Sequence, residues 1–345
     1  MRVLVTGGAG LVGSHCAEYY ANKGDTVIVL DNLMRSTIFG YQKESVEFNW
    51  NYLKQFKSIE LVKGDVRNAA DVEKAIGRGV DLVIHTAGQP GVPSSVRNPT
   101  EDFSINAFGT LNCIEAARRK SGTTTIVYCS TNKVYGENVD ALALVEKPKR
   151  YQYAAVKGVD EGMSTDRTGH TPYGVSKLVG DLYVQEYSHI YKMKTGVFRM
   201  SCTYGTRQFG FEDQGWVAWF IIATLFNKPV TIYGNGKQVR DMLYVDDLVD
   251  AFDRFARSSL ERGLFNIGGG PENTISLLEF LDILHELIGK KPRVSFADWR
   301  PSDQKVYVTD TSKLEKGLSW KIQTPVREGI ARLVEWVKKN ESYFS

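Results

Sequence analysis

The sequence predicts an α/β protein in which a doubly wound parallel sheet is followed by a smaller part of mixed α/β structure. Through the first half of the 345 residues, short apolar runs alternate with stretches of helical periodicity. Strands that alternate with helices favour a parallel sheet covered on both faces. A glycine-rich turn follows the first apolar run directly, and beyond residue 204 the pattern becomes mixed. A chain of this length can bury a large core, and two subdomains are expected.

The strands and helices of this sheet follow from the apolar runs and from the residues that end them. We expect strands at residues 3–5, 26–30, 59–65, 82–85, 125–130 and 197–200, and helices at 14–23, 107–120 and 173–193. Ligands of such sheets bind at the carboxyl ends of the strands. Those ends carry the glycine-rich turn, Asp31, Asp65, His85 and Ser130, so we expect these positions to converge on one ligand.

The rest of the chain is less regular. Residues 135–172 are predicted to form a long loop near the site, since long loops in compact domains are often binding elements. Helices are expected at 277–288 and 325–338, and a strand at 306–309. We expect a Rossmann-type dinucleotide domain over residues 1–200, rejoined by about 236–258. A substrate-binding domain is expected over 201–235 and 259–345.

The glycine-rich turn has the spacing of a dinucleotide site. Residues 6–13 read Thr-Gly-Gly-Ala-Gly-Leu-Val-Gly, between a strand and a helix. Gly7 permits the tight turn, Gly10 lets the backbone approach a pyrophosphate, and Gly13 lets the helix pack close to the strand. The helix N-terminus at Leu11 and Val12 favours the charge of a phosphate.

An acid ends the second predicted strand. Asp31 lies roughly 20 residues beyond the turn, where a ribose 2′-hydroxyl is expected. A carboxylate accepts a hydrogen bond from that hydroxyl and repels a 2′-phosphate, so NAD is favoured over NADP. Asn32 adjoins it at the same strand end. Arg35 leaves NADP open, because a nearby arginine can accommodate the phosphate.

Tyr173 and Lys177 are four residues apart on a predicted helix, so their side chains share one face. A tyrosine has a pKa of about 10, which is too high for a general base near neutral pH because almost no phenolate is present. An adjacent ammonium and a bound nicotinamide cation would lower that pKa. Thr131 could hold a substrate oxygen while Tyr173 exchanges its proton, and Ser130 adjoins it at the same strand end. The sequence therefore predicts a catalytic set of Thr131, Tyr173 and Lys177.

Composition excludes several other classes of function. The net charge is +3, so nucleic-acid binding has no electrostatic support. The four cysteines are widely spaced and form no zinc pattern, and no metal site is expected. No apolar run approaches the ~20 residues of a membrane span. The chain begins with a strand rather than a signal peptide, and a cytoplasmic protein is expected.

Three motifs together resemble the extended short-chain dehydrogenase/reductase family. They are the turn at residues 6–13, Ser-Thr-Asn-Lys-Val-Tyr-Gly at 130–136, and Tyr-x-x-x-Lys at 173–177. Residues 85–87 (His-Thr-Ala), Asn106 and residues 240–247 match further family positions. The resemblance covers nearly the whole chain, and it implies an NAD-dependent enzyme that acts on a nucleotide sugar.

The resemblance also implies roles for individual residues. Asp65 and Val66 would contact adenine, Ala87 and Gln89 the middle of the cofactor, and Asn106 would lie near its reactive half. Implied substrate contacts are Asn132, Lys133, Gln208, Gln214, Arg240 and Arg300. The arginines would hold the diphosphate or its ribose, since a guanidinium fork suits phosphate oxygens. The alternative for each arginine is a surface salt bridge.

Within the family, the residues after the catalytic threonine separate the reactions. Sugar 4,6-dehydratases carry Asp-Glu there, whereas this chain has Asn132-Lys133. An amide and an ammonium cannot supply the same acid and base, so dehydration is disfavoured. Epimerisation by transient oxidation, or a net reduction, remains. Residues 130–136, 207–210 and 213–220 and the long segment before Tyr173 resemble family members that epimerise CDP-linked deoxyhexoses at C2.

Two other functions remain open at this point. A UDP-hexose 4-epimerase would use the same chemistry on another carbon, and CDP cannot be told from UDP on physical grounds here. A non-catalytic NAD-binding regulator is disfavoured because Thr131, Tyr173 and Lys177 are all retained. The resemblance further implies a homodimer or homotetramer, with helices near 101–120 and 173–192 packing across a two-fold axis.

Overall fold

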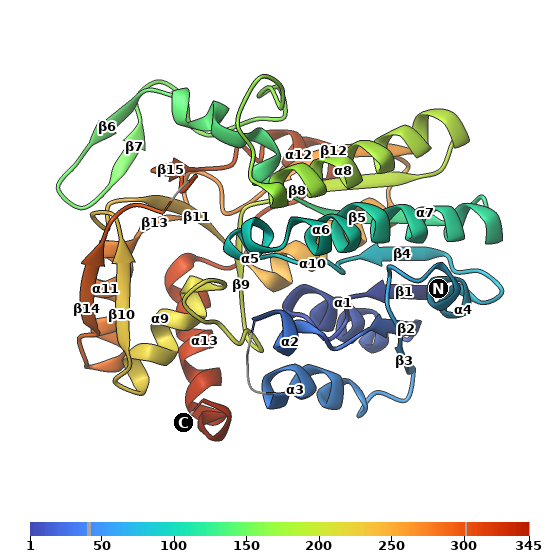
Figure 1. Cartoon of the computed structure of the whole chain (residues 1–345), viewed down its shortest axis with the longest axis horizontal. Coiled ribbons are helices and arrows are strands. Elements are labelled where there is room, and N and C mark those ends of the chain that lie inside the picture. Colours follow the sequence, from blue (N-terminus) through green and yellow to red (C-terminus); the bar gives the residue numbers. More distant parts are fainter. Residues whose placement is uncertain (40–42, 301, 345) are drawn as a thin grey trace. The chain divides into compact units, whose positions relative to one another are not determined.

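Seven strands form the main sheet of the computed structural model, in the order β12-β8-β5-β4-β1-β2-β3 (Figure 1). The structure describes residues 1–39, 43–300 and 302–344. The strands are β1 (Arg2–Thr6), β2 (Thr26–Asp31), β3 (Ile59–Lys63), β4 (Leu82–His85), β5 (Thr125–Thr131), β8 (Thr195–Met200) and β12 (Arg262–Ile267). The pairs from β5 through β4, β1 and β2 to β3 are parallel. The predicted Rossmann-type α/β sheet is confirmed.

The register of these strands aligns their carboxyl ends. Thr6 pairs with Leu30 on one side and with His85 on the other. His85 in turn pairs with Tyr128, and Asp31 pairs with Lys63. The polar residues that follow each strand are therefore brought to one edge of the sheet, as the sequence predicts.

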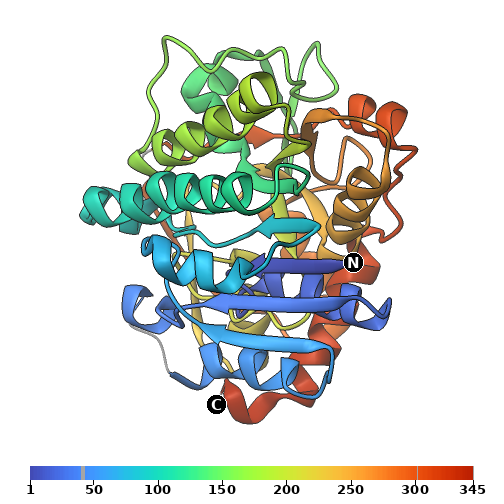
Figure 2. The same ribbon diagram turned by 90° about the vertical axis from the view of Figure 1, so that its right-hand side faces the viewer.

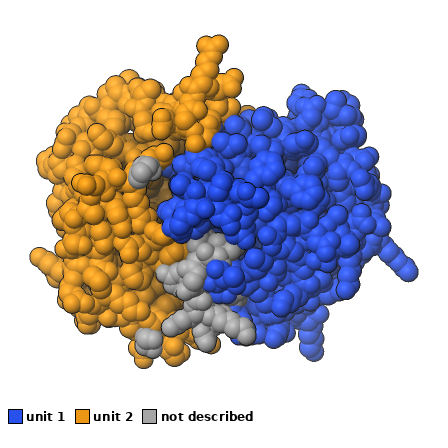
Figure 3. All heavy atoms as spheres, in the orientation of Figure 1, with its two compact units in different colours: residues 1–134, 171–199, 249–265 blue, residues 135–170, 200–248, 266–345 orange. Residues whose placement is uncertain are grey.

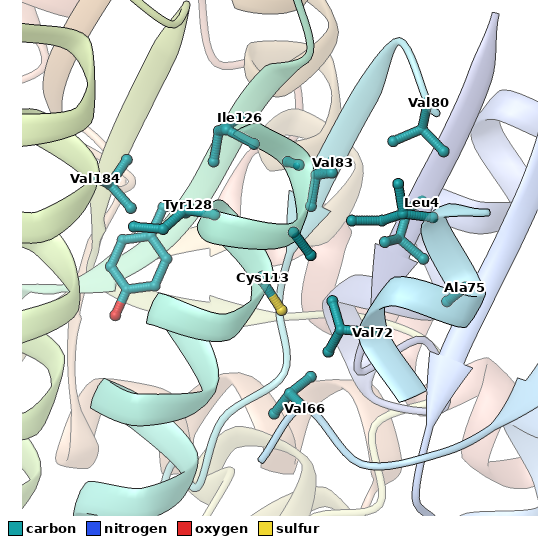
Figure 4. Packing of buried hydrophobic residues seen from close by; sticks show 14 of the residues in the cluster. Leu4, Val66, Val72, Ala75, Val80, Val83, Cys113, Ile126, Tyr128 and Val184 are labelled. Carbon is teal, nitrogen blue, oxygen red and sulfur yellow. The ribbon is translucent and has the colours of Figure 1, made fainter. Parts of the chain in front are cut away.

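One face of the sheet packs against α4 (Ala69–Ile76), α7 (Gly109–Lys120) and α8 (Pro172–Tyr191). Figure 2 shows α7 and α8 running side by side along it. Leu4, Val83 and Tyr128 from the strands meet Val72 and Cys113 from the helices in one buried cluster (Figure 4). Full burial of each large apolar side chain contributes roughly 1.5–3 kcal/mol.

The opposite face packs against α1 (Leu11–Asn22) and α10 (Val245–Arg257). The rings of Phe198 on β8 and Phe252 on α10 lie 4.9 Å apart, edge to face. The Lys23 ammonium, at the end of α1, lies 2.7 Å from the Asp253 carboxylate of α10. Helices thus cover both faces, which is what makes the sheet doubly wound.

The chain divides into two compact units, which Figure 3 shows in different colours. Unit 1 comprises residues 1–134, 171–199 and 249–265, and unit 2 comprises residues 135–170, 200–248 and 266–345. The domain limits predicted from the sequence stay a prediction. Other helices of unit 1 are α2 (Arg35–Phe39), α3 (Lys43–Leu53), α5 (Val92–Arg97), α6 (Pro99–Phe103) and the π-helix η1 (Ser104–Phe108).

Unit 2 contains several small sheets and four α-helices of its own among the described residues. Its strands are β6 (Leu144–Glu146), β7 (Tyr151–Tyr153), β9 (Cys202–Tyr204), β10 (Pro229–Tyr233), β11 (Val239–Tyr244), β13 (Thr274–Ser276), β14 (Arg293–Ala297) and β15 (Val306–Tyr307). Its helices are α9 (Trp216–Leu225), α11 (Leu277–Ile288), α12 (Ser312–Leu318), α13 (Val326–Lys339) and two 3-10 segments, η2 (Asn132–Ala141, which starts in unit 1) and η3 (Glu341–Tyr343). Strand β11 pairs with β13, β15 and β9, and β10 pairs with β14.

The long loop predicted at 135–172 contains more structure than expected. It begins within η2, and β6 and β7 form an antiparallel hairpin. The hairpin is held by contacts distant in sequence: Tyr151 N donates to Lys237 O at 2.9 Å, and the Tyr153 hydroxyl donates to Val306 O at 3.0 Å. Across the described residues, none of the helices is both long enough and apolar enough to cross a membrane.

Candidate active site

The glycine-rich turn joins β1 to α1. Gly7 has a φ of +71°, and a side chain there would meet the backbone of Ala87 at 2.6 Å. A Cβ on Gly13 would lie 2.3 Å from Gly7 O, so only glycine lets α1 come this close. Gly10 is the N-cap of α1, and of the described residues none caps this helix with a side chain. The first N–H groups of α1, at Leu11 and Val12, have no partner within the helix and suit an anion.

The end of β2 carries Asp31 where the sequence predicts it. Its carboxylate accepts from Ala9 N at 2.9 Å and from Leu33 N at 2.7 Å. Burial raises the pKa of Asp31, and these backbone donors oppose the shift. The carboxylate is therefore held against the glycine-rich turn, with acceptor capacity left for a ribose hydroxyl.

Asp65 lies beside this strand end. Asn32 Nδ2 donates to Asp65 Oδ2 at 2.9 Å, and the Arg67 guanidinium contacts both carboxylate oxygens at 2.6–3.1 Å. Burial acts to raise the pKa of Asp65, but the bonds from Arg67 and Asn32 outweigh it and lower that pKa. Asp31, Asn32 and Asp65 thus form one polar edge, and Arg67 is a member that the motifs do not identify.

Three further predicted cofactor contacts lie around this edge. Arg35 begins α2, shortly after Asp31. Val66 is buried against α7, where Asn112 donates to its carbonyl at 2.9 Å. Ala87 N approaches the Thr6 hydroxyl at 3.3 Å. The structure places these residues at the same sheet edge as the turn, and their roles stay predictions.

Thr131, Tyr173 and Lys177 come together in unit 1. Thr131 ends β5, and Tyr173 and Lys177 lie on the first turns of α8, which Thr171 caps. The Thr131 hydroxyl lies close enough to the Tyr173 phenol to lower its pKa. The Lys177 ammonium is buried and lies 4.3 Å from the centre of the Tyr128 ring. The set that the spacing predicts is therefore spatially adjacent.

Burial dominates the electrostatics of this set. It raises the pKa of Tyr173 to about 12, against the effect of the Thr131 hydroxyl. It also lowers the pKa of Lys177 to about 8. The sequence-based expectation of a lowered Tyr173 pKa is therefore wrong for the protein's own groups, because burial disfavours the charged phenolate. A positive charge on a bound cofactor would act in the opposite direction.

Ser130 has a structural partner. Its hydroxyl donates to Asp181 Oδ2 at 2.6 Å, and Arg199 contacts the same carboxylate at 2.9 Å. All three side chains are buried. The hydroxyl proton is donated to Asp181, so the Ser130 side chain could contact a cofactor only as a hydrogen-bond acceptor.

Gln89 and Asn106 are joined by two hydrogen bonds. Gln89 N donates to Asn106 Oδ1 at 2.8 Å, and Asn106 Nδ2 donates to Gln89 O at 3.1 Å. Asn106 lies in the π-helix η1, a rare distortion that is frequent at functional sites. Both side chains also contact Asp102, which the motifs do not identify. His85 is fully satisfied by Thr6 and Thr110, and burial lowers its pKa to about 3, so it is a neutral core residue.

The predicted substrate arginines lie in unit 2 and hold carboxylates. Arg240 contacts Asp303 at 2.6 Å, and Arg300 contacts Asp213 at 2.9 Å. The Arg300 guanidinium also lies 3.9 Å from the centre of the Tyr233 ring. Both arginines are partly buried. The salt bridges expected as the alternative are thus present, and a diphosphate would compete with these carboxylates.

The remaining predicted substrate residues are placed as follows. Asn132 and Lys133 begin η2, directly after Thr131, and Lys133 N donates to the Thr131 hydroxyl at 3.2 Å. Gln208 is buried, and its Oε1 has no hydrogen-bond partner among the described residues. Gln214 closes a tight turn with Phe211 through two backbone hydrogen bonds of 3.0 and 3.1 Å.

Three charged residues, Asp102, Arg67 and Asp303, are missing from the sequence-based set. Arg67 follows the predicted acid Asp65 by two positions, so proximity in sequence could have suggested it. Asp102 and Asp303 meet their partners across 74 and 63 residues, Ser176 and Arg240 respectively. A short sequence motif cannot predict contacts between residues this far apart in the chain.

Comparisons with known proteins agree with this geometry. Residues 3–268 match the model of the NAD dependent epimerase/dehydratase family. The chain is 39% identical to CDP-paratose 2-epimerase of Salmonella typhi, over 97% of this chain and 99% of that relative. The crystal structure of Thermus thermophilus UDP-glucose 4-epimerase in complex with NAD is similar, with a TM-score of 0.79 and 31% identity, covering 98% of this chain and 99% of that one. UDP-glucuronic acid 4-epimerase from Bacillus cereus, in complex with UDP-glucuronic acid and NAD, gives 0.83 and 25% identity, covering 99% and 100%.

Proposed function

The chain belongs to the NAD dependent epimerase/dehydratase family, and we propose that it epimerises a CDP-linked hexose or deoxyhexose at C2, as in the interconversion of CDP-paratose and CDP-tyvelose. The observation that carries the proposal is the adjacency of Thr131, Tyr173 and Lys177 in the unit that holds the glycine-rich turn and Asp31. NAD is the cofactor, and the uncapped start of α1 and the Asp31 carboxylate fit its pyrophosphate and ribose.

The protein's part in the reaction is proton transfer and orientation. NAD, when bound, would supply the hydride acceptor for the oxidation and the hydride donor for the reduction on the opposite face, so no external reductant would be consumed. Tyr173 accepts the proton of the sugar hydroxyl and gives it back when the alcohol re-forms. Thr131 holds the sugar oxygen, and the Lys177 ammonium stabilises the phenolate. The keto sugar rotates within the site between the two steps. This rotation requires firm binding of the nucleotide and loose binding of the hexose.

Two features favour epimerisation over dehydration. Asn132 and Lys133 follow Thr131 directly, and neither side chain can act as the carboxylic acid and carboxylate pair of an elimination. The near full-length relative at 39% identity carries the name of a 2-epimerase. The same relative supports a CDP-linked substrate and reaction at C2.

Arg240 and Arg300 are proposed to hold the substrate diphosphate. Each guanidinium already pairs with a carboxylate in unit 2, which keeps it ordered and partly buried. A diphosphate offers more oxygens and more charge than one carboxylate, so it can replace that partner at an arginine fork. Gln208 and Gln214 are proposed to make polar contacts to the base or sugar.

The protein is further proposed to be a homo-oligomer in the cytoplasm. Apolar side chains of α8 are exposed at regular helical spacing: Val175, Leu182, Tyr183, Ile190 and Tyr191. Exposed apolar patches of this kind mark interaction sites. The face supports association of two copies through α8, as a dimer or as part of a tetramer.

A UDP-hexose 4-epimerase is the second candidate. The similar structures of two UDP-sugar 4-epimerases favour it, since the catalytic residues serve either carbon. The sequence identity to these structures is lower than the identity to the CDP-sugar relative. For this reason we favour the reaction at C2. A non-catalytic regulator would have no need for Thr131, Tyr173 and Lys177 together.

The test is an NMR time course of the purified protein with CDP-tyvelose, CDP-glucose and UDP-glucose, supplied separately and without added NAD. We expect inversion at C2 of a CDP-sugar, which also requires that NAD stays bound through purification. Inversion at C4 of UDP-glucose would move the protein to the second candidate. Failure to convert any of the three, with NAD present, would contradict both.

A further inference from the structure

Asp102 is a buried carboxylate that the proposed reaction does not use. It lies on α6, one turn before Asn106, and only 1% of its surface is exposed. Burying a carboxylate is costly unless hydrogen bonds or opposite charges compensate it. The hydrogen-bond partners of Asp102 therefore indicate its role.

Three side chains from three segments contact this carboxylate. Ser176 Oγ on α8 donates to Oδ2 at 2.5 Å. Gln89 Nε2 and Asn106 Nδ2 donate to Oδ1 at 3.0 and 3.1 Å. Since two amide groups donate to Oδ1, that oxygen acts only as an acceptor. Burial raises the pKa of Asp102, and the Ser176 hydrogen bond, the Lys177 charge and the Gln89 hydrogen bond oppose the shift.

These partners belong to the surroundings of the catalytic pair. Ser176 lies between Tyr173 and Lys177 on α8, and its hydroxyl also contacts Tyr173 O at 3.1 Å. Asn106 turns its Nδ2 toward Asp102 and Ser176, which leaves its Oδ1 to receive Gln89 N. One carboxylate thus sets the orientation of the Asn106 amide and fixes the α8 turn that carries both catalytic side chains.

The charge of Asp102 also acts on that pair. Burial raises the pKa of Tyr173 and lowers that of Lys177, and the Asp102 carboxylate raises both pKa values. Cys129 also raises the pKa of Tyr173, and Cys129 and Asp181 raise the pKa of Lys177. The charge of Lys177 in turn lowers the pKa of His85. Arg97 and Glu101 line the same small cavity as Asp102.

We propose that Asp102 is a positioning residue for Tyr173 and Lys177, which holds the α8 turn through Ser176 and places a negative charge near both side chains. The proposal rests on the proposed function, because it concerns the same catalytic pair. It adds a residue from α6 that touches neither the pair nor the reacting atoms.

The test is Asp102→Asn in the NAD-loaded enzyme. An asparagine can keep Oδ1 as the acceptor and donate from Nδ2 to the Ser176 hydroxyl, so the fold has no obvious conflict. Removal of the charge lowers the pKa of both Tyr173 and Lys177. The acidic and basic limbs of the kcat profile should therefore both move to lower pH, by at least about half a unit. Loss of packing alone would lower the plateau without moving the limbs.

A second readout does not depend on the substrate. The ultraviolet absorbance of the phenolate, titrated in the holoenzyme with Tyr173→Phe as the subtraction, reports the ionisation of Tyr173 directly. It should move to lower pH in Asp102→Asn. If no sugar is converted but this titration moves, the proposed function fails and the inference about Asp102 stands.

Two variants control for charge and packing. Glu101→Gln removes the same charge from the neighbouring position of α6, where the carboxylate lies 3.8 Å from Arg67, and should leave both limbs in place. Asp102→Glu keeps the charge, and the cavity of about 170 Å³ that Asp102 and Gln89 help to line has room for its extra methylene. Its limbs should stay at the wild-type pH.

Unmoved limbs in Asp102→Asn, or an equal shift in Glu101→Gln, would overturn the inference. If Asp102→Asn does not fold, Ser176→Ala replaces it as the test variant. It keeps the Asp102 charge but removes the hydrogen bond between Asp102 and α8. Its kcat should then fall roughly tenfold, with KM and bound NAD unchanged. A wild-type kcat in that variant would overturn the positioning role.

Discussion

At the scale of single residues, burial sets the protonation of the catalytic pair. It moves the pKa of Tyr173 up to about 12 and that of Lys177 down to about 8, so the protein's own groups favour the neutral phenol. The positive charge of an oxidised nicotinamide bound at this site would favour the phenolate. The base is therefore expected to form when the oxidised cofactor is bound, which is the state that starts the reaction.

Tyr173→Phe should abolish turnover while leaving NAD bound. The phenyl ring keeps the packing but removes the proton acceptor, and such groups contribute roughly 10²–10⁴-fold to the rate. The measurement is kcat by NMR together with the NAD content of the denatured protein. Tyr183→Phe, an exposed tyrosine of the same helix, is the matched control and should retain activity. Normal turnover in Tyr173→Phe would remove this residue from its assigned role.

The sequence could predict catalytic residues that are close in sequence or lie at strand ends. Tyr173 and Lys177 share a helix face, and the parallel register brings Thr131 to them. Asp102 could not be found this way, because its bond to Ser176 spans 74 residues and forms only when α6 packs on α8. The raised pKa of Tyr173 likewise depends on burial, which a motif does not contain.

At the scale of elements, periodicity predicted the long helices and the buried strands. The helix expected at 277–288 is α11, Leu277–Ile288, and that expected at 325–338 is α13, Val326–Lys339. The β6–β7 hairpin was missed because three-residue strands show too little alternation to be recognised. It is hydrogen-bonded to Lys237 and Val306, which lie far along the chain. The π-turn of η1 also departs from the single helix expected over 107–120.

The contact between the glycine-rich turn and α1 gives a prediction about this element. Gly13→Ala places a methyl group 2.3 Å from Gly7 O and 2.7 Å from Gly8 Cα, which are backbone atoms that cannot move aside. Helix α1 must shift, at a cost of roughly 1–3 kcal/mol, and its N-terminus leaves the pyrophosphate position. We expect a lower melting temperature and little bound NAD after purification. Gly122→Ala, which has open space around it, should change neither; an unaffected Gly13→Ala would mean that the turn does not bind the cofactor as proposed.

At the scale of the whole molecule, the apolar face of α8 is the feature that the single chain leaves unexplained. Leu182 and Ile190 are 53% and 62% exposed, and each lies two helical turns beyond another exposed apolar residue, Val175 and Tyr183 respectively. A face of this kind on one helix is self-complementary when a second copy meets it across a two-fold axis. Burial against that copy would remove the cost of exposing these side chains to water.

Replacement of both residues, Leu182→Asp with Ile190→Asp, should convert the proposed oligomer to monomers, because two facing helices would then bring four carboxylates into an apolar interface. The mass in solution is measured by light scattering after size-exclusion chromatography. The fold should survive, since both positions are exposed in the monomer. Phe296→Asp, at a large exposed residue of β14 in unit 2, is the control and should keep the wild-type mass. An unchanged mass of the double variant would place the interface elsewhere. A monomeric mass for the wild-type protein would contradict the proposal of an oligomer.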